Sequence, residues 1–201
     1  MLAEKKIASH KSLYGIMMDV NDFKCINDNL GHSTGDKAIC TLGNILIRSI
    51  PDDGMAIRYA GDEFIVLLSG VDTERVLATM EEINRNLSRF NESGIEPFHL
   101  SVSMGYTEFG TEDDAETFLM HMDEKMYEEK RKYHMRKKSA GLENKVSHYV
   151  PAICPITGCN GTRKENIIII KRVADWCKSG FAARFYIYGY RQGCSRFQYS
   201  K

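Results

Sequence analysis

The chain has 201 residues, of which 43% are hydrophobic and 27% are charged, and its formal net charge is zero. These values are typical of a globular protein with enough chain for one ordinary domain and an additional segment, and they argue against disorder throughout. The longest apolar run covers residues 167–170, far fewer than the roughly 20 residues that cross a bilayer. Because the N-terminus also lacks the apolar segment of a signal peptide, we expect a cytoplasmic protein without a membrane segment.

The zero net charge hides an asymmetry between two parts of the chain. Residues 1–138 carry 17 basic and 24 acidic side chains, whereas residues 139–201 carry 10 basic and 3 acidic ones. The helical pattern before Lys138 is also lost after it, so we expect a domain over residues 1–138 and a basic C-terminal extension over residues 139–201. The sequence does not indicate the fold of the extension. Basic and aromatic side chains interleave there, but we do not expect nucleic acid as a partner.

Apolar periodicity and turn residues predict the order of helices and strands. In chain order the predicted elements are the end of a helix over 2–12, a strand over 14–20, helices over 21–29 and 33–49, strands over 55–59 and 63–69, a helix over 72–89, a strand over 99–106 and a last helix from residue 113. We expect Ser33 or Thr34 to cap the helix over 33–49. We expect Asp113 or Asp114 to cap the last helix. This order, with its antiparallel hairpin, predicts a ferredoxin-like α+β fold in which helices pack on one face of a mixed sheet.

Two acidic turns, about forty residues apart, lie at the ends of predicted strands. Asp19 ends the first strand, and Asp62 and Glu63 lie at the turn of the hairpin. If the two strands are neighbours in one sheet, these carboxylates converge and need a cation. Hard divalent ions bind oxygen ligands and are typically held by one or two carboxylates together with substrate phosphates. The two turns therefore predict a site for nucleotide phosphates and a metal ion.

Five motifs, in the same order along the chain, resemble those of the GGDEF family of diguanylate cyclases. They lie between about residues 10 and 138 and read DVNDFKCINDNLGH from Asp19, GD from Gly35, RYAGDEF from Arg58, SVSMG from Ser101 and MDEKMYEEK from Met122. This family condenses two GTP molecules into cyclic di-GMP with release of pyrophosphate, and each half of an antiparallel homodimer holds one GTP. The resemblance therefore implies the nucleotidyl cyclase variant of the ferredoxin-like fold, a diguanylate cyclase activity, and GTP and a second copy of the chain as partners.

The same resemblance implies the metal ligands and the catalytic residues. Asp19, the carbonyl group of Val20 and Asp62 would coordinate Mg²⁺ or Mn²⁺, which lowers the pKa of the attacking ribose 3′-hydroxyl group. Glu63 would bind a second ion or assist deprotonation of that hydroxyl group, and the sequence does not separate its role from that of Asp62. Arg58 would reach a phosphate or stabilise the transition state, although a cross-strand charge pair is an alternative.

Six further positions correspond to substrate contacts of the family: Lys24, Asn27, His32, Asp36, Gly61 and Lys130. Lys24, at the start of a helix, and Lys130, on the last helix, would bind the triphosphate. Asn27 and Asp36 would read the guanine edge, since a carboxylate accepts from its N–H groups and a carboxamide both donates and accepts. Taken singly, Asn27 and Asp36 also suit helix starts, and His32 also suits a packed loop.

Several departures from the family pattern leave a second function open. Ala60 replaces the opening glycine of the signature motif, a change that costs about 1 to 2 kcal/mol if φ is positive there. His134 stands where the family has an arginine, four residues after Lys130, so a permanent bidentate phosphate ligand is lost. Only about a dozen residues precede the first predicted strand in this sequence, and from the resemblance we expect the family's preceding segment to be missing.

The alternative that these departures favour is a degenerate GGDEF domain that binds GTP or cyclic di-GMP as a regulatory module without turnover. Pro51 and Gly54 occupy the two key positions of the family's product-inhibition motif, so feedback inhibition through that motif is not expected. The sequence shows no sensor, and we expect any upstream sensor to be supplied by another chain.

Overall fold

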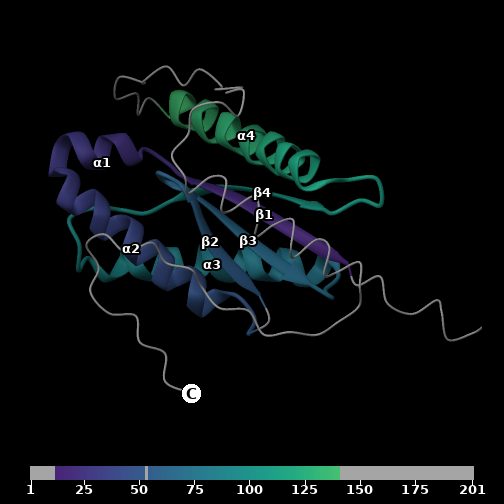
Figure 1. The fold of residues 1–201 in the computed structure, drawn as a ribbon. Coiled ribbons are helices and arrows are strands. Elements are labelled where there is room, and N and C mark those ends of the chain that lie inside the picture. The colour runs from purple at the N-terminus through teal and green to yellow at the C-terminus, as the bar shows by residue number, and fades with distance from the viewer. Residues whose placement is uncertain (1–11, 53, 141–201) are drawn as a thin grey trace, which may run out of the picture.

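The computed structural model describes residues 12–52 and 54–140. The predicted helix over residues 2–12 lies outside these residues except for residue 12, which is not helical, and the extension from residue 141 onward also lies outside them. The described elements (Figure 1) are β1 (Leu13–Val20), α1 (Phe23–Leu30), α2 (His32–Ser49), β2 (Met55–Ala60), β3 (Glu63–Ser69), α3 (Thr73–Ser93), β4 (Val102–Glu108) and α4 (Ala115–Ser139). Within the described ranges, no helix combines the length and the apolar character that crossing a bilayer requires.

The four described strands form one sheet in the order β2-β3-β1-β4, which confirms the predicted ferredoxin-like α+β class. All three pairings are antiparallel, so the expectation of a mixed sheet is not met among these strands. The reason lies in the connections, because the segment of α1 and α2 joins β1 to β2 across β3, and α3 joins β3 to β4 across β1. Strands that run in the same direction are therefore never neighbours.

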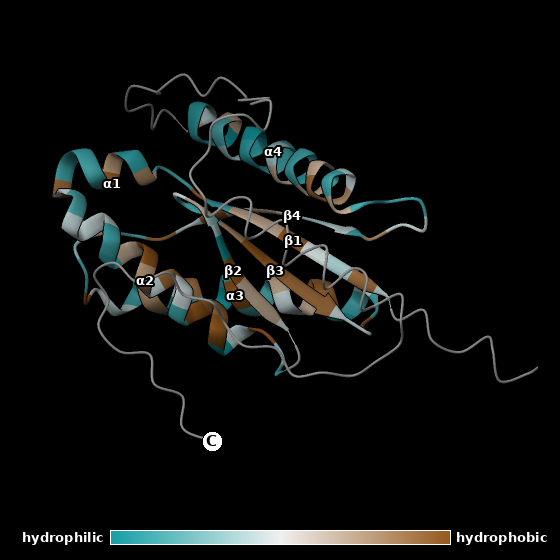
Figure 2. Cartoon of the chain, viewed as in Figure 1, coloured by the Kyte–Doolittle hydropathy of each residue, from teal (hydrophilic) through white to brown (hydrophobic). Residues whose placement is uncertain are grey.

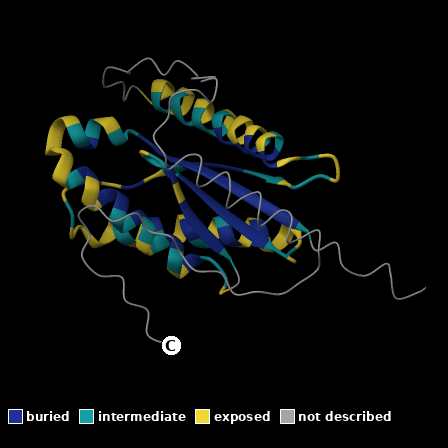
Figure 3. Ribbon diagram, in the orientation of Figure 1, coloured by how far each residue is buried: buried dark blue, intermediate teal, exposed yellow. Residues whose placement is uncertain are grey.

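Helices cover both faces of the sheet, not one face as the sequence predicted (Figure 1). The side chains of Ile16, Met18 and Val20 belong to the core that α2 and α3 cover. The side chains of Leu13 and Met17 belong to a second core, beneath α4. The alternation of a strand gives each face every second residue, and because both faces are covered, every residue of β1 is buried (Figure 3).

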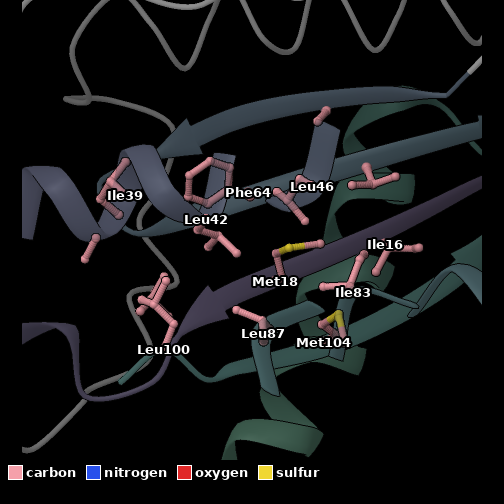
Figure 4. Packing of buried hydrophobic residues seen from close by; sticks show 14 of the residues in the cluster. Ile16, Met18, Ile39, Leu42, Leu46, Phe64, Ile83, Leu87, Leu100 and Met104 are labelled. Atoms are coloured by element: carbon pink, nitrogen blue, oxygen red, sulfur yellow. The ribbon is translucent and has the colours of Figure 1, made fainter. Parts of the chain in front are cut away.

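The larger core fills the space between α2, α3 and the sheet (Figure 4). Leu42 and Leu46 of α2 and Ile83 of α3 are all fully buried, and they surround Met18 of β1. Burying such a side chain stabilises the fold by roughly 1.5 to 3 kcal/mol. The packing of β1 in this core fixes the position of its C-terminal end.

Two glycines bring α4 unusually close to the sheet. A Cβ atom at Gly15 of β1 would lie 2.1 Å from the sulfur of Met122, and one at Gly105 of β4 would lie 2.1 Å from the backbone nitrogen of Met126. Any side chain at Gly105 would therefore collide with the backbone of the helix. This close approach sets the height of α4 above the sheet one turn before Lys130.

The starts of α3 and α4 have side-chain caps, whereas those of α1 and α2 do not. Asp114 caps α4 by accepting from the backbone N–H groups of Glu116 and Thr117, as the sequence predicted. The prediction that Ser33 or Thr34 caps α2 is wrong, because both residues lie inside the helix and Gly31 occupies the cap position at φ 84° and ψ 157°. Only Gly31 separates α1 from α2, and glycine adopts this conformation at low cost.

Candidate functional site

The C-terminal end of β1 and the β2–β3 hairpin bring the predicted acidic residues together. Asp19 pairs with Glu63 in the β1–β3 register, and the backbone N–H group of Val20 donates to the carbonyl of Asp62 at 3.2 Å. Since Met17 faces α4, the alternation of β1 directs Asp19 to the same side. The two acidic turns of the sequence are therefore adjacent, beneath the middle of α4.

Asp19 is a buried carboxylate with one satisfied and one unsatisfied oxygen atom. Its Oδ2 atom accepts from Lys130 Nζ at 2.7 Å, and both side chains are largely buried. Its Oδ1 atom is buried and has no hydrogen-bond partner in the part of the chain that the structure describes. Burial raises the pKa of Asp19 to about 6, with smaller contributions from the negative charges of Asp62 and Asp123, although Lys130 opposes the change.

Asp62 is the second acidic group at this place. Burial raises its pKa above the ordinary value, while its own backbone amide and the positive charges of Lys130 and Arg58 act in the opposite direction. Two carboxylates with raised pKa values, each held near the other, form a site at which a further positive charge would be strongly stabilised.

The hairpin that carries Asp62 is shaped by glycine at one position only. Gly61 has φ 48°, whereas Ala60 lies in β2 and has a negative φ angle. The penalty considered for Ala60 therefore does not apply. Arg58 lies exposed on β2, where its Nε–H group donates to the carbonyl of Gly61 at 2.9 Å. It holds the turn and places its charge close to Asp62.

The acidic residues fit a small divalent cation. No cluster of three or more histidine, cysteine or acidic side chains that could hold a metal occurs among the described residues, so the chain offers a partial ligand set here. Mg²⁺ is commonly bound in this manner, by one or two carboxylates with substrate phosphates and water completing the octahedron. The unpartnered Oδ1 atom of Asp19, beside Asp62, is the observation that fits such an ion. The carbonyl of Val20 lies at the same strand end.

The predicted base-reading residues lie where α1 packs on α2. A Cβ atom at Gly35 would lie 1.9 Å from the Oδ1 atom of Asn27, so the absence of a side chain at Gly35 makes room for the carboxamide. Asp36 is the next residue of α2 and is exposed. The structure thus places the two predicted guanine contacts on facing turns of adjacent helices.

The other predicted substrate residues surround the same end of the sheet on exposed positions. Lys24 is exposed in the first turn of α1, and His32 is exposed at the first position of α2. Backbone N–H groups of a helix start, with a nearby lysine, are suited to a phosphate. Lys130 differs from them, because it is already paired with Asp19.

Sequence reasoning missed a second contact between α4 and the β1–α1 loop. The Oδ2 atom of Asp22 accepts from the hydroxyl group of Tyr133 and from Lys137 Nζ, each at 2.7 Å. Burial by itself would raise the pKa of Asp22, but these two hydrogen bonds and the charge of Lys137 hold it below the ordinary value. Lys130, Tyr133 and Lys137 follow Met126 at spacings of four, three and four residues, a helical pattern that could have revealed this contact.

The residue that replaces the family's arginine lies beside this contact. His134 is half-buried, and burial together with the nearby charge of Lys130 lowers its pKa. Its side chain is therefore mostly neutral at pH 7 in the absence of a ligand.

Comparisons with known proteins identify the family that this chain resembles. A family model described as "Diguanylate cyclase, GGDEF domain" matches residues 2–136. The probable diguanylate cyclase DgcT of Escherichia coli strain K12 is 38% identical over 108 residues, which are 52% of this chain and 24% of that protein. The chain spans about a quarter of the length of the curated relatives it matches.

Two solved structures share the fold at higher coverage. The GGDEF domain of DgcB from Caulobacter crescentus, in complex with c-di-GMP, is 26% identical with a TM-score of 0.55, and the match covers 60% of this chain and 73% of that one. The active GGEEF domain of a diguanylate cyclase from Vibrio cholerae is 30% identical with a TM-score of 0.53, and the match covers 61% of this chain and 78% of that one.

Proposed function

This chain belongs to the GGDEF domain family, and from that premise we propose that it is a metal-dependent diguanylate cyclase. In this reaction the 3′-hydroxyl oxygen of one GTP attacks the α-phosphorus of a second GTP, and pyrophosphate leaves. A repeat of the same step in the opposite direction closes the ring of cyclic di-GMP. In each of the two steps, one bond between the 3′ oxygen and the α-phosphorus forms and the bond between the α-phosphorus and pyrophosphate breaks.

The observation that carries this proposal is the unpartnered, buried Oδ1 atom of Asp19 beside Asp62. A buried polar atom without a partner costs roughly 1 to 3 kcal/mol, and a structural role alone does not explain that cost. Asp19, Asp62 and the carbonyl of Val20 would hold Mg²⁺ or Mn²⁺, with Glu63 at the adjoining position of β3. When bound, the cation neutralises triphosphate charge and lowers the pKa of the 3′-hydroxyl group.

The residues of the chain itself bind and orient the substrate in this proposal. Lys24 and the first backbone N–H groups of α1 bind the triphosphate. Asn27 and Asp36 accept hydrogen bonds from the guanine edge, and Asn27 also donates one to it. Lys130 exchanges the Asp19 carboxylate for a phosphate oxygen when the nucleotide enters. Glu63 or Asp62 takes the proton of the 3′-hydroxyl group, and Arg58 lies where it can neutralise developing negative charge.

Catalysis in this proposal requires two copies of the chain. Each copy binds one GTP at the edge formed by β1, α1 and the hairpin, and an antiparallel arrangement brings the 3′-hydroxyl group of each GTP to the α-phosphorus of the other. One site alone lacks the second phosphorus atom, so the monomer binds GTP without turnover.

Incubation of the purified chain with GTP and Mg²⁺, followed by chromatographic detection of cyclic di-GMP, tests this function. We expect product with Mg²⁺ or Mn²⁺, none with EDTA, and none from ATP. The matched control is Lys132→Met, which removes an exposed lysine of α4 whose partner is Glu129 on the same helix. Absence of cyclic di-GMP at high protein concentration, from a chain that binds GTP, would contradict catalysis.

A second function is favoured by His134. Because its pKa is lowered, it does not supply the positive charge that an arginine would supply at this position. A chain that holds GTP or cyclic di-GMP but turns over no substrate would then serve as a regulatory module. His134→Arg separates the two functions, because it should create or raise turnover if the missing charge is what limits catalysis.

A further inference from the structure

Asp22 occupies a helix cap position but does not use its side chain as a cap. It precedes α1, and its backbone carbonyl accepts from the N–H groups of Cys25 and Ile26, yet its carboxylate makes no capping hydrogen bond. A capping aspartate normally stabilises the helix that it precedes. The carboxylate instead reaches Tyr133 and Lys137, more than one hundred residues away along the chain.

The backbone of Asp22 is also unusual. Its φ of 56° and ψ of 23° place it in the left-handed region, and it is the only non-glycine residue with positive φ among those that the structure describes. This conformation carries an energetic cost for an L-residue, although aspartate tolerates it better than most. Glycine would remove the cost, so a purely conformational role would favour glycine at this position.

The residue before it is held by a separate set of hydrogen bonds. Asn21 is buried, its Nδ2 group donates to Ser101 Oγ at 3.1 Å, and its Oδ1 atom accepts from Ser103 Oγ at 2.7 Å. Its backbone N–H group also donates to the carbonyl of Ser101. One residue of the loop is therefore held by the β4 side of the fold, and the next residue is held by α4.

We propose that Asp22 is a positioning residue, which fixes the loop between β1 and α1 to the last turns of α4 through Tyr133 and Lys137. The loop carries the carbonyl of Val20 at one end and Lys24 at the other. The same turns of α4 carry Lys130, which pairs with Asp19. The link sets the distance between the two groups of phosphate-binding residues, so this inference rests on the proposed function.

Two substitutions at this position separate this role from a conformational one. Asp22→Gly keeps the left-handed backbone without strain but removes the carboxylate. Asp22→Asn keeps an acceptor for Tyr133 but loses the charge that pairs with Lys137. If the carboxylate fixes the loop, the order of function is aspartate, asparagine, glycine, whereas a conformational role predicts that glycine is at least as good as aspartate.

The measurements use the full chain and two independent readouts. Hydrogen exchange follows the amides of Asn21, Cys25 and Ile26, and fluorescence follows binding of a mant-labelled GTP with Mg²⁺. We expect Asp22→Gly to accelerate exchange at these amides and to weaken nucleotide binding about tenfold, the loss expected when charge-assisted hydrogen bonds are removed. Tyr133→Phe and Lys137→Met should each have a smaller effect, and Lys132→Met should match the wild-type chain.

The two readouts distinguish the possible failures. Unchanged exchange and unchanged binding in Asp22→Gly, at a preserved thermal midpoint, would overturn the positioning role. Absence of GTP binding by the wild-type chain would instead remove the proposed function, while hydrogen exchange would still decide whether Asp22 fixes the loop. A fall in binding that is equal in Asp22→Gly and Lys132→Met would show an effect that is not specific to the contacts of Asp22 and would also overturn the inference.

Discussion

One face of α4 contacts the sheet and, toward the C-terminal end of the helix, the β1–α1 loop, and the two halves of the helix make contacts of opposite character. The first half buries an apolar stripe of Ala115, Phe118, Leu119, Met122 and Met126. The second half continues the same stripe with Lys130, Tyr133 and Lys137, which contact Asp19 and Asp22. The helix accordingly becomes more hydrophilic toward its C-terminal end (Figure 2).

The difference separates a half that stabilises the domain by apolar packing from a half that contacts the residues of the proposed site. Apolar contacts of the first half satisfy every local rule of packing. The second half contacts Asp19, which has a raised pKa and an unpartnered oxygen atom, and Asp22, which has a left-handed backbone. Violations of local rules that cluster in one place are expected at functional sites. The two halves should therefore respond in opposite ways to substitution.

The largest expected effect is the loss of turnover in Asp62→Asn. The substitution removes a charged oxygen ligand, and we expect the rate of cyclic di-GMP formation to fall by at least about a hundredfold. The thermal midpoint of the metal-free chain should stay the same or rise, since the pKa of Asp62 is raised and its ionised form is therefore disfavoured. Product assays and calorimetry on the same preparation measure both quantities. Retention of full turnover would contradict the metal role of Asp62.

Phe118→Ala tests the first half of α4. Phe118 is fully buried and packs edge-on against Phe109 at a centroid distance of 5.1 Å. We expect the free energy of unfolding to fall by about 3 to 5 kcal/mol, as measured by urea denaturation. Tyr133→Phe, in the second half, removes one hydrogen bond and should cost only about 1 kcal/mol. Equal losses in the two variants would remove the distinction between the halves.

Gly105→Ala tests the close approach between α4 and the sheet. The added methyl group would collide with the backbone at Met126, so we expect a loss of about 2 to 3 kcal/mol in unfolding free energy. Gly43→Ala is the matched control, because a Cβ atom there meets nothing within 4 Å and alanine favours the helix. It should leave stability unchanged or increase it.

The smallest expected effect is a pH dependence that arises from Asp19. Its pKa is raised from 3.8 to about 6, so its contribution to stability is fully present below about pH 4 and is lost as the pH rises through 6. Asp19→Asn does not titrate. We expect the unfolding free energy of the metal-free wild-type chain to fall by about 1 to 3 kcal/mol relative to this variant between about pH 4 and 7. Parallel pH profiles of the two proteins in EDTA would argue against a buried Asp19.

These contrasts also explain what the sequence could predict. The hairpin, the cap of Asp114 and the convergence of Asp19 with Asp62 follow from local patterns or from neighbouring strands, and the structure has all three. The helices on both faces and the antiparallel pairings depend on how connections cross the sheet, which no local pattern records. The contact of Asp22 with α4 joins residues more than one hundred positions apart, and only the stripe through Lys130 could have indicated it.

The role of Lys130 distinguishes a structural ion pair from a site prepared for a ligand. A crystal structure of the chain with Mn²⁺ and a non-hydrolysable GTP analogue, with anomalous data, tests this distinction most directly. We predict an anomalous peak within coordination distance of Asp19 and Asp62, and Lys130 Nζ moved from Asp19 to a phosphate oxygen. An ion pair between Lys130 and Asp19 that persists at 2.7 Å, with the nucleotide and the metal bound elsewhere, would contradict the account.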